Sequence, residues 1–131
     1  MLSIKDSVVY RRQGFGNAIG LGRRPALLIV DFTVGFADPA GFGGGNIRRA
    51  IGRTIGLLAF FRVRRLPVAF SRIVYADDGS DVGVFATKVP TLATLTEANP
   101  RSHIVPALAP MRGELVVRKT EPSAFFSTGL A

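Results

Sequence analysis

The chain has 131 residues, of which 47% are hydrophobic and 20% are charged, and its formal net charge is +8 at pH 7. This composition is too apolar for a disordered chain, and the length favours a single domain. No apolar run approaches the roughly 20 residues of a membrane helix, so we expect no membrane contact. The chain has no cysteine, which excludes disulfides and thiolate metal sites. The N-terminus lacks the apolar core of a secretory signal, so we expect a cytoplasmic protein.

The excess of positive charge raises the question of a polyanionic partner. The arginines fall early in the chain and again around a predicted helix, at 11–12, 23–24, 48–53 and 62–65. They never form a run of five, and no aromatic residues alternate with them as on a base-stacking surface. We therefore interpret them as a solvated helix face and expect no nucleic-acid partner.

The first half of the chain predicts an arm, a strand, a loop and a helix. Residues 1–24 are polar and glycine-rich, which indicates an arm with turns and no helix. The continuous apolar run 26–30 ends at Asp31 and is typical of a central parallel strand buried on both faces. A glycine-rich loop covers 35–45, and Asn46 is a plausible N-cap for an amphipathic helix over 47–62.

The second half predicts two more strands around an irregular stretch. Residues 67–71 form a short strand, so that strand, helix and strand make a right-handed βαβ unit. Residues 72–113 contain a weak helical stretch, and four prolines prevent any long element there. A third strand at 114–118 leads to Lys119, and 122–126 has the pattern of a helix entry.

Two of these strands end in an ionisable residue. Asp31 follows the first strand and Lys119 follows the third. Because the carboxyl ends of parallel strands share one edge of a sheet, the two side chains are a candidate proton-handling pair. Strand-end residues that merely meet water are the alternative. We expect no cofactor and no metal ion, since the glycine-rich loop lacks a phosphate-loop lysine, His103 is the single histidine, and the aspartates at 77–81 lack calcium-loop spacing.

Four motifs follow one another along the chain: RPALLIVDF at 24–32, LPVAFSR at 66–72, GELVV at 113–117 and SAF at 123–125. In this order they resemble the motifs of the isochorismatase-like cysteine hydrolases. The arm at 10–16 and the stretch at 74–80 are most similar to the N-carbamoylsarcosine amidase and maleamate amidase branch. The resemblance implies a three-layer α/β/α fold with a parallel, Rossmann-like sheet.

The resemblance also implies a reaction and its residues. Asp31 matches the family's catalytic base and Lys119 its catalytic lysine, which act with a cysteine thiolate on a small amide or carbamoyl substrate. The family mechanism needs no metal in this branch, and full-length members are expected to be homo-oligomers. Phe32 and Phe125 adjoin the motifs, so we expect them to line the pocket between Asp31 and Lys119.

The chain departs from the family pattern in several places. It has no cysteine, so we expect one incomplete domain over 1–131 that is truncated after the third strand. Arg65 stands where the family usually has a helix-terminating glycine, and Ser127 where glycine is common. Two hypotheses follow: an amidohydrolase whose nucleophile is missing, which is therefore inactive as written, or a non-enzymatic basic binding module or degenerate fragment of the same fold.

Overall fold

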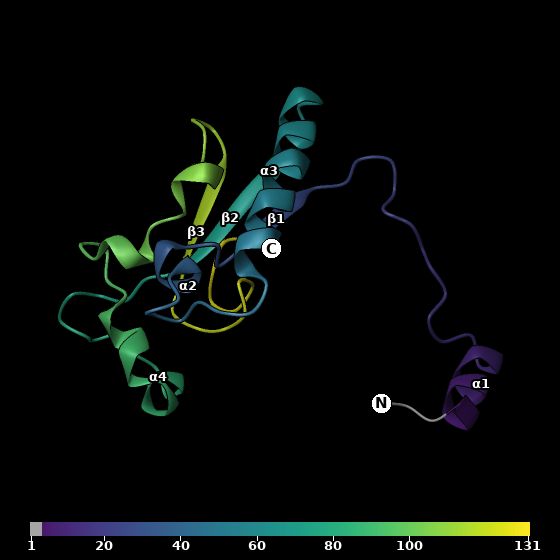
Figure 1. Cartoon of the computed structure of the whole chain (residues 1–131), viewed down its shortest axis with the longest axis horizontal. Coiled ribbons are helices and arrows are strands. Elements are labelled where there is room, and N and C mark those ends of the chain that lie inside the picture. The colour runs from purple at the N-terminus through teal and green to yellow at the C-terminus, as the bar shows by residue number, and fades with distance from the viewer. Residues whose placement is uncertain (1–3) are drawn as a thin grey trace.

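The computed structural model describes residues 4–131 and forms a small parallel sheet with helices (Figure 1). The helices and strands are α1 (Ile4–Arg12), β1 (Leu27–Val30), α2 (Val34–Ala37), α3 (Ile47–Val63), β2 (Val68–Ile73), α4 (Phe85–Lys88) and β3 (Leu115–Lys119). Short 3-10 turns lie at Pro90–Thr94, Pro100–Ser102 and Pro106–Leu108. Among the residues described, no helix is long and apolar enough to cross a bilayer.

The three strands pair in parallel in the order β1-β2-β3, as the sequence predicts. Ile29 of β1 is in register with Phe70 of β2, which is in turn in register with Val116 of β3. All three strands therefore end at one edge of the sheet, which we call the carboxyl edge, and begin at the opposite, amino edge. This polarity decides which residues meet at the candidate site.

Helix α3 covers one face of the sheet and forms the main core with it. Leu58 of α3 packs in one cluster with Ile29, Phe70 and the loop residues Val105 and Leu108. These side chains are nearly inaccessible, because the helix presents its apolar stripe to the strands. The predicted helix over 47–62 is confirmed, and it begins directly after Asn46, although the Asn46 side chain makes no capping hydrogen bond.

The end of α3 shows why a glycine is favoured there. Arg65 has a φ of 53°, in the left-handed region that penalises side chains. Its conformation lets the amide of Leu66 donate to the carbonyl of Phe61 and close the helix. Ser127 also has a left-handed φ, of 52°. The chain therefore keeps two glycine-type turns without the glycines.

Two local expectations are wrong. The arm contains α1 over 4–12, because this segment has neither glycine nor proline, and the helix ends only where Gly14 and Gly16 adopt positive φ. Helix α1 lies apart from the sheet in Figure 1. Residues 122–126 form turns and no helix, since the carbonyls of Glu121 and Pro122 face Lys119. Residues 1–3 of the predicted arm lie outside the described residues.

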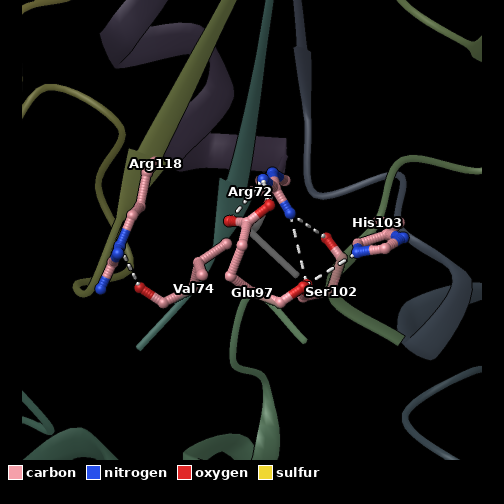
Figure 2. A network of polar contacts seen from close by, with 6 residues as sticks. All are labelled: Arg72, Val74, Glu97, Ser102, His103 and Arg118. Carbon is pink, nitrogen blue, oxygen red and sulfur yellow. Dashed lines mark hydrogen bonds and ion pairs between the residues drawn. The ribbon is translucent and has the colours of Figure 1, made fainter. Parts of the chain in front are cut away.

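A polar network fastens the irregular segment between β2 and β3 to the sheet (Figure 2). The Arg72 guanidinium binds both Glu97 carboxylate oxygens, at 2.6 and 2.7 Å, and donates to the carbonyl and hydroxyl of Ser102. His103 Nε2 lies 3.1 Å from the Glu97 carbonyl. On the neighbouring strand, Arg118 donates to the carbonyl of Val74. These contacts fix a stretch whose prolines prevent regular structure.

We expect Arg72→Met to lower the unfolding free energy by about 1–3 kcal/mol, because it leaves the buried Ser102 hydroxyl without the Arg72 donor. Glu97→Gln removes the exposed partner of the same ion pair and should cost less than about 1 kcal/mol. Urea unfolding of both variants at pH 7 measures the difference. Equal losses would show that the ion pair, and not the contact with Ser102, carries the stability.

One side of β1 has no partner strand within residues 4–131. On the face opposite α3, the Val30 and Leu115 side chains are 44% and 48% exposed, although parallel strands are normally covered on both faces. An unpaired strand next to exposed apolar groups is an aggregation hazard.

We therefore expect the 131-residue chain to aggregate on heating and to melt below about 60 °C. Val30→Lys should slow the aggregation, because a charge on an edge strand opposes pairing with another chain. Val84→Lys is the matched control, since Val84 is 83% exposed and lies outside the sheet. Light scattering during a thermal ramp compares the two, and an equal effect of both variants would count against the edge of β1.

Candidate active site

Asp31 and Lys119 meet at the carboxyl edge of the sheet. Lys119 Nζ donates to Asp31 Oδ2 at 2.9 Å, although the two residues are 88 positions apart in the chain. The Lys119 side chain has no exposed surface, and that of Asp31 is 24% exposed. The expectation that these two strand-end residues lie side by side therefore agrees with the geometry.

The backbone of Asp31 explains how its side chain reaches Lys119. Residues alternate between the faces of a strand, so a regular continuation of β1 would turn Asp31 toward the face that carries Ile29. Lys119 is in register with Ile73 and lies on the other face. Asp31 instead has a φ of 58°, while its amide still donates to the carbonyl of Ser71 at 3.0 Å. Such strain is typical of functional positions.

The Lys119 ammonium uses its three protons within the protein. Besides Asp31, it donates to the carbonyl of Pro122 at 2.9 Å and to that of Glu121 at 3.3 Å. A buried ammonium is stable only with such a complete set of acceptors. These three contacts hold Asp31 and the segment that follows β3.

The Asp31 carboxyl is only half satisfied. Oδ2 accepts from Lys119, whereas Oδ1 is buried and has no hydrogen-bond partner among the described residues. Burial raises the pKa of the Asp31 carboxyl above 3.8, and the hydrogen bond and charge of Lys119 oppose that rise. Oδ1 is therefore available to accept a proton. The hydroxyls of Thr33 and Ser71 are also buried and have no hydrogen-bond partner among the described residues.

A cavity of about 380 Å³ opens beside Asp31. Its other walls are apolar and come from α2, the glycine-rich loop, β2, the irregular segment and the turn after β3: Phe36, Phe42, Ile73, Phe85, Val89, Leu92 and Pro122. The rings of Phe36 and Phe42 lie 5.1 Å apart and form one wall. The cavity thus joins one carboxyl to an apolar space large enough for a small molecule.

The two predicted pocket phenylalanines do not line this cavity. Phe32 packs against the core cluster under α3, because the chain turns at Asp31 and sends the next side chain inward. Phe125 lies in a surface turn and is 60% exposed. Phe36 follows the RPALLIVDF motif by four residues, whereas Phe42 and Phe85 belong to segments that carry no periodic signal.

No group of three or more potential metal ligands lies close together within residues 4–131. Asp81, one of the aspartates at 77–81, instead accepts from the Ala76 amide and pairs with Arg118 at 2.8 Å. That part of the loop is held by the fold, and the expectation of a site without metal or cofactor stays a prediction.

Comparison with known proteins places the chain in a family. The model of the isochorismatase domain matches residues 25–131. The chain belongs to the isochorismatase family. It is 38% identical over 119 residues to the maleamate amidohydrolase of Pseudomonas putida, covering 89% of this chain and 56% of that protein. It is 30% identical over 128 residues to the N-carbamoylsarcosine amidase of an Arthrobacter species, covering 93% of this chain and 48% of that protein.

Solved structures agree with this assignment. A cysteine hydrolase from Pseudomonas syringae pv. phaseolicola superposes with a TM-score of 0.70 at 27% identity, over 86% of this chain and 56% of that one. An isochorismatase family protein from Desulfovibrio vulgaris gives a TM-score of 0.69 at 28% identity, over 79% and 56%. The chain spans about half the length of the curated relatives it matches.

The pKa of Asp31 gives a pH signature for the site. Because the folded state raises this pKa, the stability that the group contributes is complete below pH 3.8 and is lost as the pH rises through the raised value. We therefore expect the unfolding free energy of the wild type, minus that of Asp31→Asn, to fall as the pH rises above 3.8.

Urea unfolding between pH 3 and 7 measures this difference for the wild type and the variant. The matched control is Asp38→Asn, which removes an exposed carboxylate 3.4 Å from Arg101 and outside the cavity. A difference that is flat, or that rises with pH, would mean that Lys119 outweighs burial at Asp31.

Proposed function

We propose that this chain carries the aspartate and lysine of an amidohydrolase that cleaves the C–N bond of a small amide or carbamoyl compound. The observation that carries the proposal is the 2.9 Å contact of Lys119 with Asp31 beside an apolar cavity. The two curated relatives are both amide-cleaving enzymes by name, which supports the reaction class.

In the proposed reaction, Asp31 is the general base and a cysteine thiol is the nucleophile. The 131 residues contain no cysteine, so the thiol has to come from the part of a complete domain that this chain does not include. Asp31 Oδ1 has no partner among the described residues and so has a lone pair for the thiol proton. Its raised pKa makes it a better proton acceptor than an exposed carboxylate.

The remaining steps follow ordinary thiol chemistry. The thiolate attacks the carbonyl carbon of the amide, and the C–N bond breaks as the proton on Asp31 passes to the departing ammonia. Water then attacks the thioester, which releases the acid and returns the proton to the thiol. Throughout this cycle Lys119 holds Oδ2 in place, since its ammonium already has three acceptors.

The apolar walls favour a substrate whose carbon skeleton is uncharged where it touches this chain. Phe36, Phe42 and Phe85 offer ring surface, and Asp31 is the only charged group that lines the cavity among the described residues. A carboxylate on the substrate would need a cation from elsewhere in a complete domain. We expect the skeleton to lie against the phenylalanines with its amide carbon toward Asp31.

The second candidate is a non-enzymatic binding module or degenerate fragment of the same fold. The absence of cysteine and the net charge of +8 favour it. Under this alternative Asp31 and Lys119 only hold the carboxyl edge together, and no completion of the domain would restore turnover.

A chimera separates the two candidates. Residues 1–131 followed by the C-terminal half of the P. putida maleamate amidohydrolase should release ammonia from maleamate or a related amide, and the 131-residue chain alone should not. In the chimera, Asp31→Asn should lower kcat by at least about 100-fold, the usual contribution of a positioned general base. Lys119→Ala should also lower kcat, because it removes the ammonium that holds Asp31 Oδ2.

The matched control in the chimera is Asp38→Asn, which should keep kcat within about twofold because this carboxylate pairs with Arg101 and does not line the cavity. Full activity of the Asp31→Asn chimera would refute the assignment of the base. Ammonia release by the chain alone at an enzyme-like rate would refute the thiol mechanism. A folded but inactive chimera would favour the binding module.

A further inference from the structure

The amino edge of the sheet gathers arginines that are far apart in the sequence. Each strand is preceded by at least one: 23–24 before β1, 64–65 before β2 and Arg112 before β3. The amide of Leu27 donates to the carbonyl of Pro67, and Ala69 is in register with Leu115, so the three entry segments share one edge. The charge that looks scattered in the sequence is therefore concentrated opposite the candidate active site.

A cavity of about 650 Å³ lies at this amino edge. Arg65 comes from the turn after α3 and Arg112 from the turn before β3, and both line it. Leu66, Met111 and Leu115 supply apolar surface in the same cavity. A concave space of this size that is lined by both charged and apolar side chains has the composition of a small-molecule site.

Two neighbouring arginines have partners within the protein, which sets Arg65 and Arg112 apart. Arg62 binds Glu114 through two hydrogen bonds of 2.8 Å, which lowers the pKa of Glu114 and neutralises the one carboxylate in the cavity. Arg64 lies over the Phe60 ring at 3.7 Å. No carboxylate within residues 4–131 lies within ion-pair distance of Arg65 or Arg112.

We propose that this cavity binds a small organic polyphosphate, such as a nucleoside diphosphate, at a site separate from the candidate active site. The phosphates bind Arg65 and Arg112, because a guanidinium offers paired donors that match phosphate oxygens. The organic part packs on Met111 and Leu115. The concave shape favours a small ligand over a nucleic-acid strand.

Isothermal titration of the 131-residue chain with ADP at about 50 mM salt tests the proposal. We expect ADP to bind with a sub-millimolar Kd and adenosine to bind at least about tenfold more weakly, since phosphate provides the charge-assisted contacts. The double variant Arg65→Gln, Arg112→Gln should weaken ADP binding by at least about tenfold. Arg112→Gln alone should weaken it severalfold, and it decides the question if the double variant fails to fold.

The matched control is Arg11→Gln, Arg12→Gln, which removes the same charge from helix α1 and leaves the cavity intact. This control should bind ADP within about twofold of the wild type. Equal losses in the two double variants would show a nonspecific effect of net charge and overturn the proposal. So would equal affinity for ADP and adenosine, or tighter binding of a single-stranded oligonucleotide that also depends on Arg65 and Arg112.

Discussion

The buried ammonium of Lys119 is the constraint on which the carboxyl edge depends. A charge without exposed surface is costly, and only an exact set of acceptors offsets that cost. The acceptors come from the end of β1 and from the segment after β3, so one side chain joins the two outer strands of the sheet across β2. The left-handed backbone of Asp31 and the turn at 121–122 both follow from that need.

Much of the fold was accessible from the sequence because its signals are local. The apolar run before Asp31 and the three-and-four spacing of α3 each specify one element, and Pro67 separates that helix from β2. Helix α1 is not predicted from the sequence because Val8, Val9 and Tyr10 are consecutive and exposed, and only the absence of glycine and proline favours a helix there. The turns at 122–126 are not predicted because the carbonyls of Glu121 and Pro122 bind Lys119, a contact that no local sequence pattern encodes.

The candidate site, like the fold, is predictable from the sequence only in part. Asp31 and Lys119 could be found because each ends a strand, and strand direction alone brings such residues to one edge. The cavity walls cannot be found from the sequence. Phe42 comes from a glycine-rich loop, and Phe85 comes from the proline-containing stretch that the ion pair of Arg72 with Glu97 holds against the sheet. The path of those segments depends on long-range polar contacts. Family resemblance supplied the chemistry of Asp31 and Lys119, but adjacency to a motif was a poor guide to the pocket.

Because the strands are parallel, the two edges of the sheet carry different charged groups. The carboxyl edge holds a paired carboxylate and ammonium. At the amino edge Arg62 pairs with Glu114, but Arg65 and Arg112 have no carboxylate partner among the described residues. The six residues of β2 span about 20 Å between these edges, more than twice the screening length of about 8 Å at physiological salt. The exposed arginines of the amino edge therefore act on Asp31 much more weakly than Lys119, whose ammonium lies 2.9 Å from its carboxyl.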